Sequence, residues 1–310
     1  MRIDRLILML LIAALLAGGL MITAMAEENI QIVCTSFPCY DFARAIADEG
    51  DTIRLLIRPG TEVHAYEPTT GDIMAIAQCD LFIYIGGESD AWADDILESF
   101  GDDAPQAVRL IDCVDPVAEE EQPNMTHEGV HGHDDAIEYD EHIWTSPANA
   151  ARMVEAVAEA MRGVSDHPSY AENAQVYISS IRAVDARIEE IVQNGTRREM
   201  IFADRFPFLY FVRQYGLEYY AAFPSCAAES EPSAKTLAFL IDRVETDGIP
   251  VVYTIEMSNQ RTAAIIAEET GAEILTFYSV QTVTEADFSA GETYVTLMEK
   301  NADALARGLN

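Results

Sequence analysis

The chain contains 310 residues, of which 53 are acidic and 19 are basic, so its formal net charge is −34. This charge argues against a nucleic-acid-binding protein, because contacts to phosphates need clustered lysine and arginine side chains. Hydrophobic residues make up 49% of the chain, enough for the cores of about two domains, which excludes a disordered acidic tail.

The acidic charge is concentrated in one region. Between Gly86 and Glu141 the chain has 18 acidic residues and one basic residue, Arg109, which gives this region a net charge of −17. Five of the six histidines lie between His64 and His142. Such a region is either a solvated surface that keeps the protein soluble or a surface that attracts cations, and the histidines favour the second interpretation.

The first 26 residues have the pattern of a secretory signal peptide. Arg2 and Arg5 precede an apolar run, and Ala24-Met25-Ala26 forms a cleavage pattern of small residues. The alternative is an uncleaved membrane anchor, because the apolar stretch is about long enough to span a bilayer. In both cases we expect the globular part to be exported, to the periplasm or the outer face of the cytoplasmic membrane.

Strands and helices alternate in the first half of the chain after residue 26. Continuous apolar strands such as Leu81–Ile85 favour a parallel sheet that is covered on both faces. The polar segment from Asp112 to Glu141 then interrupts the alternation, and its composition predicts a mobile loop. The predicted strands are Ile30–Thr35, Ile53–Ile57, Leu81–Ile85 and Ala107–Ile111, and the predicted helices are Tyr40–Ala47, Asp72–Gln78 and Ala91–Phe100.

Two helices are predicted in the middle of the chain. Ser146 and Pro147 mark the start of the first, which ends at Gly163, because serine caps helices and proline fits the first turn. From Tyr170 to Val192 apolar residues recur every three or four positions. This spacing predicts one helix of roughly 35 Å, at about 1.5 Å per residue.

The alternation of strands and helices resumes in the second half. The sequence therefore predicts an α/β protein with two lobes, each a mostly parallel sheet flanked by helices, bridged by one long helix. We expect an N-terminal lobe at 27–165 that includes an acidic, His-rich loop at 112–141, a linking helix at 166–195 and a C-terminal lobe at 196–310. The predicted strands are Met200–Ala203, Glu218–Ala222, Pro250–Ile255 and Glu273–Phe277, and the predicted helices are Phe208–Tyr215, Ser233–Thr246, Asn259–Thr270 and Glu292–Leu309.

Two histidines lie where such sheets bind ligands, which is beyond the carboxyl ends of the strands. His64 follows the second predicted strand, and His142 directly precedes the helix that begins at Pro147. A lone histidine is more often a structural residue than a ligand. Position alone therefore leaves both roles open.

Several motifs around these histidines resemble a known family. They are Pro-Gly-x-x-x-His-x-Tyr-Glu-Pro at 59–68, Asp-Leu-Phe-Ile-Tyr-Ile-Gly-Gly at 80–87 and Asp-Glu-His-Ile-Trp-x-Ser-Pro at 140–147. Together with the loop rich in His, Asp and Glu between them, they are similar to the substrate-binding proteins of zinc and manganese ABC transporters. The resemblance continues to the last helix and implies two α/β lobes bridged by a long helix.

The resemblance also implies a metal site with four ligands, two from each lobe. The first two map onto His64 and His142. The third position falls on Arg205, which cannot bind a cation, so we expect its neighbour Asp204 instead. The fourth falls on a tyrosine, so we expect Glu256, just after a predicted strand. Zn²⁺ is the expected ion, with Mn²⁺ possible, because imidazole suits Zn²⁺ while carboxylates also suit harder cations.

The expected function is that of a non-enzymatic, extracytoplasmic substrate-binding protein. It would bind one divalent ion between its lobes and deliver it to an ABC permease that is driven by an ATPase subunit. By the same resemblance, His127, His131 and His133 in the acidic loop would capture ions and pass them to the cleft.

Two alternatives remain open at this stage. One is a metal buffer that binds ions only through the acidic loop. The other is a secreted zinc peptidase, because His127-Glu128-Gly129-Val130-His131 matches the H-E-x-x-H motif of zinc peptidases. That motif needs a firm helix, which Gly129 weakens by roughly 1 kcal/mol relative to alanine.

Overall fold

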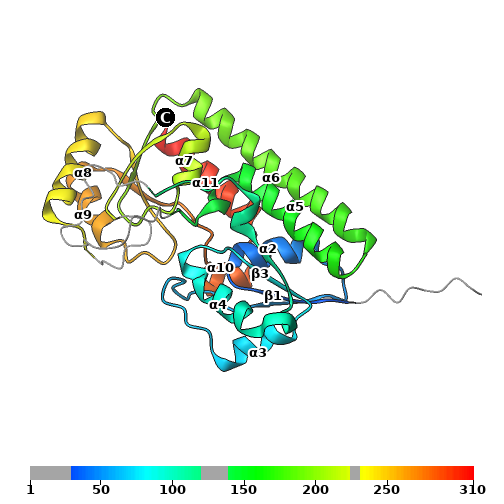
Figure 1. The fold of residues 1–310 in the computed structure, drawn as a ribbon. Helices are drawn as coiled ribbons and strands as arrows, with labels where there is room; N and C mark the ends of the chain where they lie inside the picture. Colours follow the sequence, from blue (N-terminus) through cyan, green and yellow to red (C-terminus); the bar gives the residue numbers. More distant parts are fainter. Residues whose placement is uncertain (1–28, 120–138, 224–230) are drawn as a thin grey trace, which may run out of the picture.

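The computed structural model describes residues 29–119, 139–223 and 231–310 (Figure 1). The predicted signal peptide at 1–26 and the loop histidines His127, His131 and His133 lie outside these residues. Within the three described ranges, no helix is both long enough and apolar enough to cross a membrane.

The N-terminal lobe is built on a four-stranded parallel sheet with the strand order β2-β1-β3-β4. The inner strand β3 is buried along its whole length, whereas the edge strand β4 is exposed at its start. This difference explains why β3 is a continuous apolar run, as the sequence predicts for a strand covered on both faces. The elements are β1 (Gln31–Cys34), α2 (Phe37–Ile46), β2 (Thr52–Leu55), α3 (Thr70–Gln78), β3 (Leu81–Tyr84), α4 (Ala91–Phe100) and β4 (Gln106–Arg109).

The C-terminal lobe repeats this plan with the strand order β6-β5-β7-β8, again all parallel. Its inner strand β7 is fully buried. Helix α10 has only five residues, which is too short to show a helical period, so its pattern does not predict a helix. The elements are β5 (Glu199–Phe202), α7 (Leu209–Tyr215), β6 (Glu218–Ala221), α8 (Ala234–Asp247), β7 (Val251–Thr254), α9 (Arg261–Thr270), β8 (Glu273–Thr276), α10 (Glu285–Ser289) and α11 (Tyr294–Gly308).

Helices α5 (Pro147–Val164) and α6 (Pro168–Asn194) connect the two lobes. Helix α6 packs against α5 and α2 and also against α11, so it runs beside elements of both lobes (Figure 1). At 27 residues and about 1.5 Å per residue it is roughly 40 Å long, which confirms the predicted long helix. Two parallel sheets flanked by helices and bridged by α6 confirm the predicted fold class.

One irregular segment of the C-terminal lobe, residues 279–283, is hydrogen-bonded along its length to the N-terminal lobe. Trp144 Nε1 donates to the carbonyl of Ser279 (2.8 Å). The backbone N–H groups of Phe37 and Gly60 donate to the carbonyls of Gln281 (3.4 Å) and Val283 (2.8 Å). The three carbonyls belong to Ser279, Gln281 and Val283, in a segment that is bent at Gln281 and Thr282 and has a left-handed φ of 62° at Val280. These bonds hold the two lobes together beside the carboxyl ends of their strands.

A buried carboxylate makes a second connection between the lobes. Asp41 on α2 is fully buried and accepts hydrogen bonds from the Tyr177 hydroxyl on α6 and the Tyr294 N–H at the start of α11. It also forms an ion pair with Arg44 (2.7 Å). Burial raises the pKa of Asp41, and these partners act in the opposite direction. Asp41 therefore joins helices from three parts of the chain.

We expect Asp41→Ala to lower the free energy of unfolding by about 3–5 kcal/mol, because it leaves the Tyr177 hydroxyl and the Tyr294 N–H without their acceptor and creates a small cavity. Urea denaturation followed by circular dichroism measures the change. The matched control is Asp242→Ala on the exposed face of α8, which should change stability by less than about 0.5 kcal/mol. Equal stability of the two variants would contradict this role for Asp41.

Candidate metal centre

His64 lies in the irregular segment after β2, at the carboxyl end of the N-terminal sheet. Gly60 has a left-handed φ of 78° in this segment, a conformation that glycine adopts at little cost. His64 Nδ1 is 2.9 Å from Oε1 of Glu62. Its Nε2 is buried and has no hydrogen-bond partner among the described residues. One nitrogen of the ring is thus available to a ligand.

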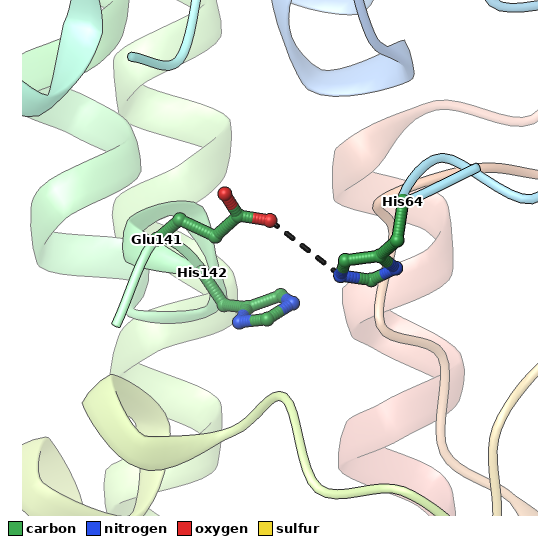
Figure 2. A group of neighbouring side chains, drawn as sticks. All are labelled: His64, Glu141 and His142. Atoms are coloured by element: carbon green, nitrogen blue, oxygen red, sulfur yellow. Dashed lines mark ion pairs between the residues drawn. The ribbon is translucent and has the colours of Figure 1, made fainter. Parts of the chain in front are cut away.

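Glu141 and His142 lie next to each other in a tight turn that precedes α5. His142 has φ −79° and ψ 44°, and the N–H of Ile143 donates to the carbonyl of Glu141 (2.8 Å). This geometry is close to an inverse γ-turn centred on His142. Consecutive side chains of an extended strand point to opposite sides, whereas this turn lets both side chains face His64 (Figure 2).

His64, Glu141 and His142 form a compact group of potential metal ligands. One ligand atom from each residue lies within 4.8 Å of the other two. His64 Nε2 is 3.6 Å from Oε1 of Glu141, as the dashed line in Figure 2 marks. His142 is fully buried, and its Nε2 also has no hydrogen-bond partner within the described part of the chain. Two unpartnered imidazole nitrogens beside a carboxylate are a donor set that suits Zn²⁺.

Each histidine is oriented by a carboxylate on its other nitrogen. Asp140 Oδ1 lies 3.1 Å from Nδ1 of His142 and also accepts from the His142 backbone N–H (2.8 Å). Glu62 has the same relation to Nδ1 of His64. Carboxylates of this kind fix the ring and its tautomer in protein metal sites. The Nε2 atom of each histidine is therefore the one that points toward the other two members of the group.

The charges around the group shift several pKa values. Burial alone lowers the pKa of His142, but the carboxylates of Asp140, Glu141 and Glu119 outweigh burial, and the net shift is upward. The hydrogen bond with His64 is the main cause that lowers the pKa of Glu62 to about 2, because together with the contact to Arg205 it outweighs the opposing effect of burial. The cleft is therefore rich in negative charge, which favours a bound cation.

Glu141 is held in place by residues of both lobes. Its Oε2 accepts from the N–H of Ser89 (2.9 Å), and its Oε1 accepts from the Ser89 hydroxyl. Gln281 Nε2 lies 3.5 Å from Oε1. Behind it lies Asp90, whose pKa is raised to about 6, first by burial and then by the charge of Glu141. A cation bound at Glu141 would offset this repulsion between two carboxylates.

Asp204, a predicted ligand, lies two residues after the end of β5 in the C-terminal lobe. Its Oδ1 accepts from the N–H of Arg205 (2.9 Å). Its Oδ2 is buried and lacks a hydrogen-bond partner among the residues described. Asp204 does not belong to the group formed by His64, Glu141 and His142. One oxygen of the Asp204 carboxylate, Oδ2, nevertheless receives no hydrogen bond from any described residue.

Glu256, the other predicted ligand, follows β7 and is also outside that group. It is buried, and both of its oxygens accept hydrogen bonds from Ser279, one from the N–H (2.7 Å) and one from the hydroxyl. Burial raises the pKa of Glu256 to about 7. With His64 and Arg205 it lines a cavity of about 30 Å³ that has walls from both lobes. The roles of Asp204 and Glu256 stay predictions.

Glu141 is the residue of the site that the sequence analysis missed. It is part of the Asp-Glu-His motif at 140–142, but nothing in the motif shows that two adjacent side chains point the same way. The signal that could have identified it is its position beside His142 just before a proline-initiated helix, where an extended conformation ends. The direction of its side chain depends on the turn itself.

The fold and this donor set define a two-lobed α/β protein with a candidate metal site. The family described as ZnuA, zinc-uptake complex component A, periplasmic, matches residues 32–308. The chain therefore belongs to this family. It is a family of solute-binding transport components and not of enzymes, which argues against the peptidase alternative. Its description also indicates a location outside the cytoplasm.

Curated relatives cover most of this chain. The zinc-binding lipoprotein AdcA of Streptococcus pneumoniae is 29% identical over 286 residues, which is 90% of this chain and 56% of AdcA. The chain thus spans little more than half the length of that relative. The high-affinity zinc uptake system protein ZnuA of Bacillus subtilis is 27% identical over 287 residues, covering 91% of this chain and 88% of that protein.

Solved structures share the fold. The Zn(II)-bound ZnuA-like domain of Streptococcus pneumoniae AdcA superposes with a TM-score of 0.74 at 26% identity, covering 91% of this chain and 99% of that domain. The metal-dependent lipoprotein YcdH of Bacillus subtilis superposes with a TM-score of 0.77 at 25% identity, covering 91% of this chain and all of that structure.

Proposed function

We propose that the protein is the extracytoplasmic substrate-binding component of an ABC importer for a divalent metal, with zinc as the main cargo and manganese as the second candidate. The observation that carries this proposal is the convergence of His64, Glu141 and His142, with both imidazole Nε2 atoms unpartnered in the described structure. The family match and relatives named for zinc binding support it.

In this proposal one ion binds between an N-terminal lobe at 27–165 and a C-terminal lobe at 196–310, which are linked by 166–195. The N-terminal lobe supplies His64, Glu141 and His142. Asp204 is the proposed fourth ligand, because its Oδ2 is buried without a partner among the described residues. Glu256 is the weaker candidate, because Ser279 already occupies both of its oxygens.

The proposed partners are a membrane permease and its ATPase subunit, which would take the ion after release. We propose export by a cleaved signal peptide at 1–26, with an uncleaved anchor as the alternative. Because α6 contacts both lobes and the segment 279–283 bonds them together, release is expected to need small shifts and not a wide opening. The histidines His127, His131 and His133 are proposed to capture ions for the cleft.

Calorimetric titration of zinc into the purified protein tests this function and separates it from the loop buffer. We expect one tight site in the full chain, and the same site after deletion of residues 119–139, because its proposed ligands lie outside the deleted segment. A chain that loses all zinc binding on deletion would be a buffer. X-ray absorption of the bound ion then gives the ratio of oxygen to nitrogen ligands, which tests the carboxylates.

Zinc affinity should fall as the pH is lowered, because only a neutral imidazole binds the ion. The neighbouring carboxylates hold the pKa of His142 above its usual 6.5, so protons compete with zinc at a higher pH than they would at an unperturbed imidazole. Below that pKa each protonated imidazole should cost about tenfold in affinity per pH unit. Competition titrations across this range, in two buffers of different ionisation enthalpy, measure the affinity and the protons released. Constant affinity between about pH 5.5 and 8 would contradict imidazole ligation.

A further inference from the structure

A single carboxylate connects His64 to the opposite lobe. Glu62 Oε1 is 2.9 Å from Nδ1 of His64, and its Oε2 accepts from a guanidinium nitrogen of Arg205, also at 2.9 Å. Glu62 belongs to the N-terminal lobe, in the segment after β2, and Arg205 belongs to the C-terminal lobe, in the segment after β5. All three side chains line the same cavity between the lobes.

The contact with Glu62 determines which nitrogen of His64 is free. An ionised carboxylate only accepts hydrogen bonds, so Nδ1 must carry the proton and Nε2 must carry the lone pair in the neutral ring. Nε2 is the atom that faces Glu141. Glu62 thus aims the lone pair of His64 at the place where Glu141 and His142 converge.

We propose that Glu62 is the positioning residue of His64 and that the Glu62–Arg205 ion pair is a latch that couples metal occupancy to the contact between the lobes. The proposal rests on the proposed function of the cleft. A cation on Nε2 draws electron density from the ring and makes Nδ1–H a stronger donor to Glu62. When His64 holds Oε1 of Glu62 more firmly, Oε2 of the same carboxylate stays directed at Arg205. By linkage, the closed contact in turn favours the bound ion.

The surroundings of the latch explain why it can open. The segment that carries His64 is fixed at one end by the Gly60 N–H bond to the Val283 carbonyl. Nearer His64 it is joined to the C-terminal lobe by the Glu62–Arg205 pair. The side chains of Glu62 and Arg205 are 45% and 27% exposed, and ion pairs in contact with water contribute little by themselves. The latch is therefore weak by itself, and in this proposal the loss of the ion favours its opening.

The test compares Glu62→Gln, Arg205→Met and the double variant with the wild type. Glu62→Gln should weaken zinc binding by about 10- to 100-fold, the range typical of outer-shell partners, and should speed zinc release to a chelator in stopped flow. Arg205→Met should have a smaller effect, and the two effects should not add. Arg205→Lys should recover part of the effect, because it keeps the charge but not the planar fork.

Hydrogen–deuterium exchange provides a readout that a purely structural role would not change. In the wild type, zinc should slow exchange in residues 58–66, and the double variant should lose this zinc-dependent protection. The matched control is Glu155→Gln, which alters an exposed ion pair with Arg182 on α5 and α6 and should leave affinity, release and exchange unchanged.

Two outcomes would overturn the latch, and they are distinguishable. If His64→Ala abolishes zinc binding while the Glu62 and Arg205 variants match the wild type in affinity, release rate and exchange, the latch is wrong and the metal-binding function stands. If the wild-type protein binds no zinc, the proposed function fails and the latch fails with it.

Discussion

Replacement of His142 by alanine should lower zinc affinity by more than about 100-fold, which exceeds the loss typical of outer-shell residues. The imidazole is fully buried, its Nδ1 is oriented by Asp140, and its Nε2 has no partner in the described structure. Its removal would take away a ligand and leave Asp140 buried with one interaction fewer. His64→Ala should have a similar effect on affinity. Competition with a chromogenic chelator measures both variants.

The control for these variants is His167→Ala. This imidazole caps α6 through the Ser169 N–H and lies 3.4 Å from Asp48, away from the cleft, so zinc affinity should not change. Because His142 is buried, His142→Asn provides a second variant whose amide can still donate to Asp140, and thermal melting checks that both fold. Tight zinc binding in both His64→Ala and His142→Ala would disprove the cleft site.

Glu141→Gln should weaken zinc binding by at least about 100-fold while leaving the metal-free protein as stable as the wild type. The amide keeps the size of the side chain and an acceptor for Ser89, but it loses the negative charge that favours the ion. The same charge raises the pKa of the buried Asp90, so its removal relieves a repulsion. Zinc titration and urea denaturation measure the two effects separately.

A matched acidic residue separates ligation from general attraction of cations. Glu98 is exposed on α4, in the same acidic region, and Glu98→Gln should leave zinc affinity within about twofold, because exposed charges are screened by salt. If Glu98→Gln and Glu141→Gln have equal effects, Glu141 only attracts ions. Asp204→Asn, measured in the same way, tests whether the C-terminal lobe supplies a ligand.

Most elements of the fold could be predicted because their signals are local. The predicted limits of the helix at 91–100 agree with α4, and the long helix predicted from Tyr170 to Val192 corresponds to α6 within two residues at each end. Caps, prolines and apolar spacing act over one or two turns, so they are visible in the sequence. The segment 279–283, which joins the lobes, carries no such signal because its hydrogen bonds go to residues distant in the chain.

The site could be predicted from the sequence where a ligand lies next to the recognisable end of a strand or start of a helix. His64 comes after a strand and His142 before a capped helix, so both could be selected, and the structure brings them together. Glu141 was missed because its direction depends on the turn at His142. The sequence pattern identified Arg205 only as a residue that cannot bind a cation. The structure places Arg205 in contact with Glu62 of the other lobe, which the sequence pattern does not show.

The sequence alone determined the acidic charge, the two α/β halves, the long helix between them and the two histidines. Each of these follows from composition or from interactions between residues close in the chain. The tertiary structure decided which carboxylates meet the histidines, because that depends on the turn at His142 and on how the segment after β2 packs beside it within the N-terminal lobe. Half of the net charge lies between Gly86 and Glu141, but only in the folded chain is one of those carboxylates, Glu141, placed beside His64 and His142.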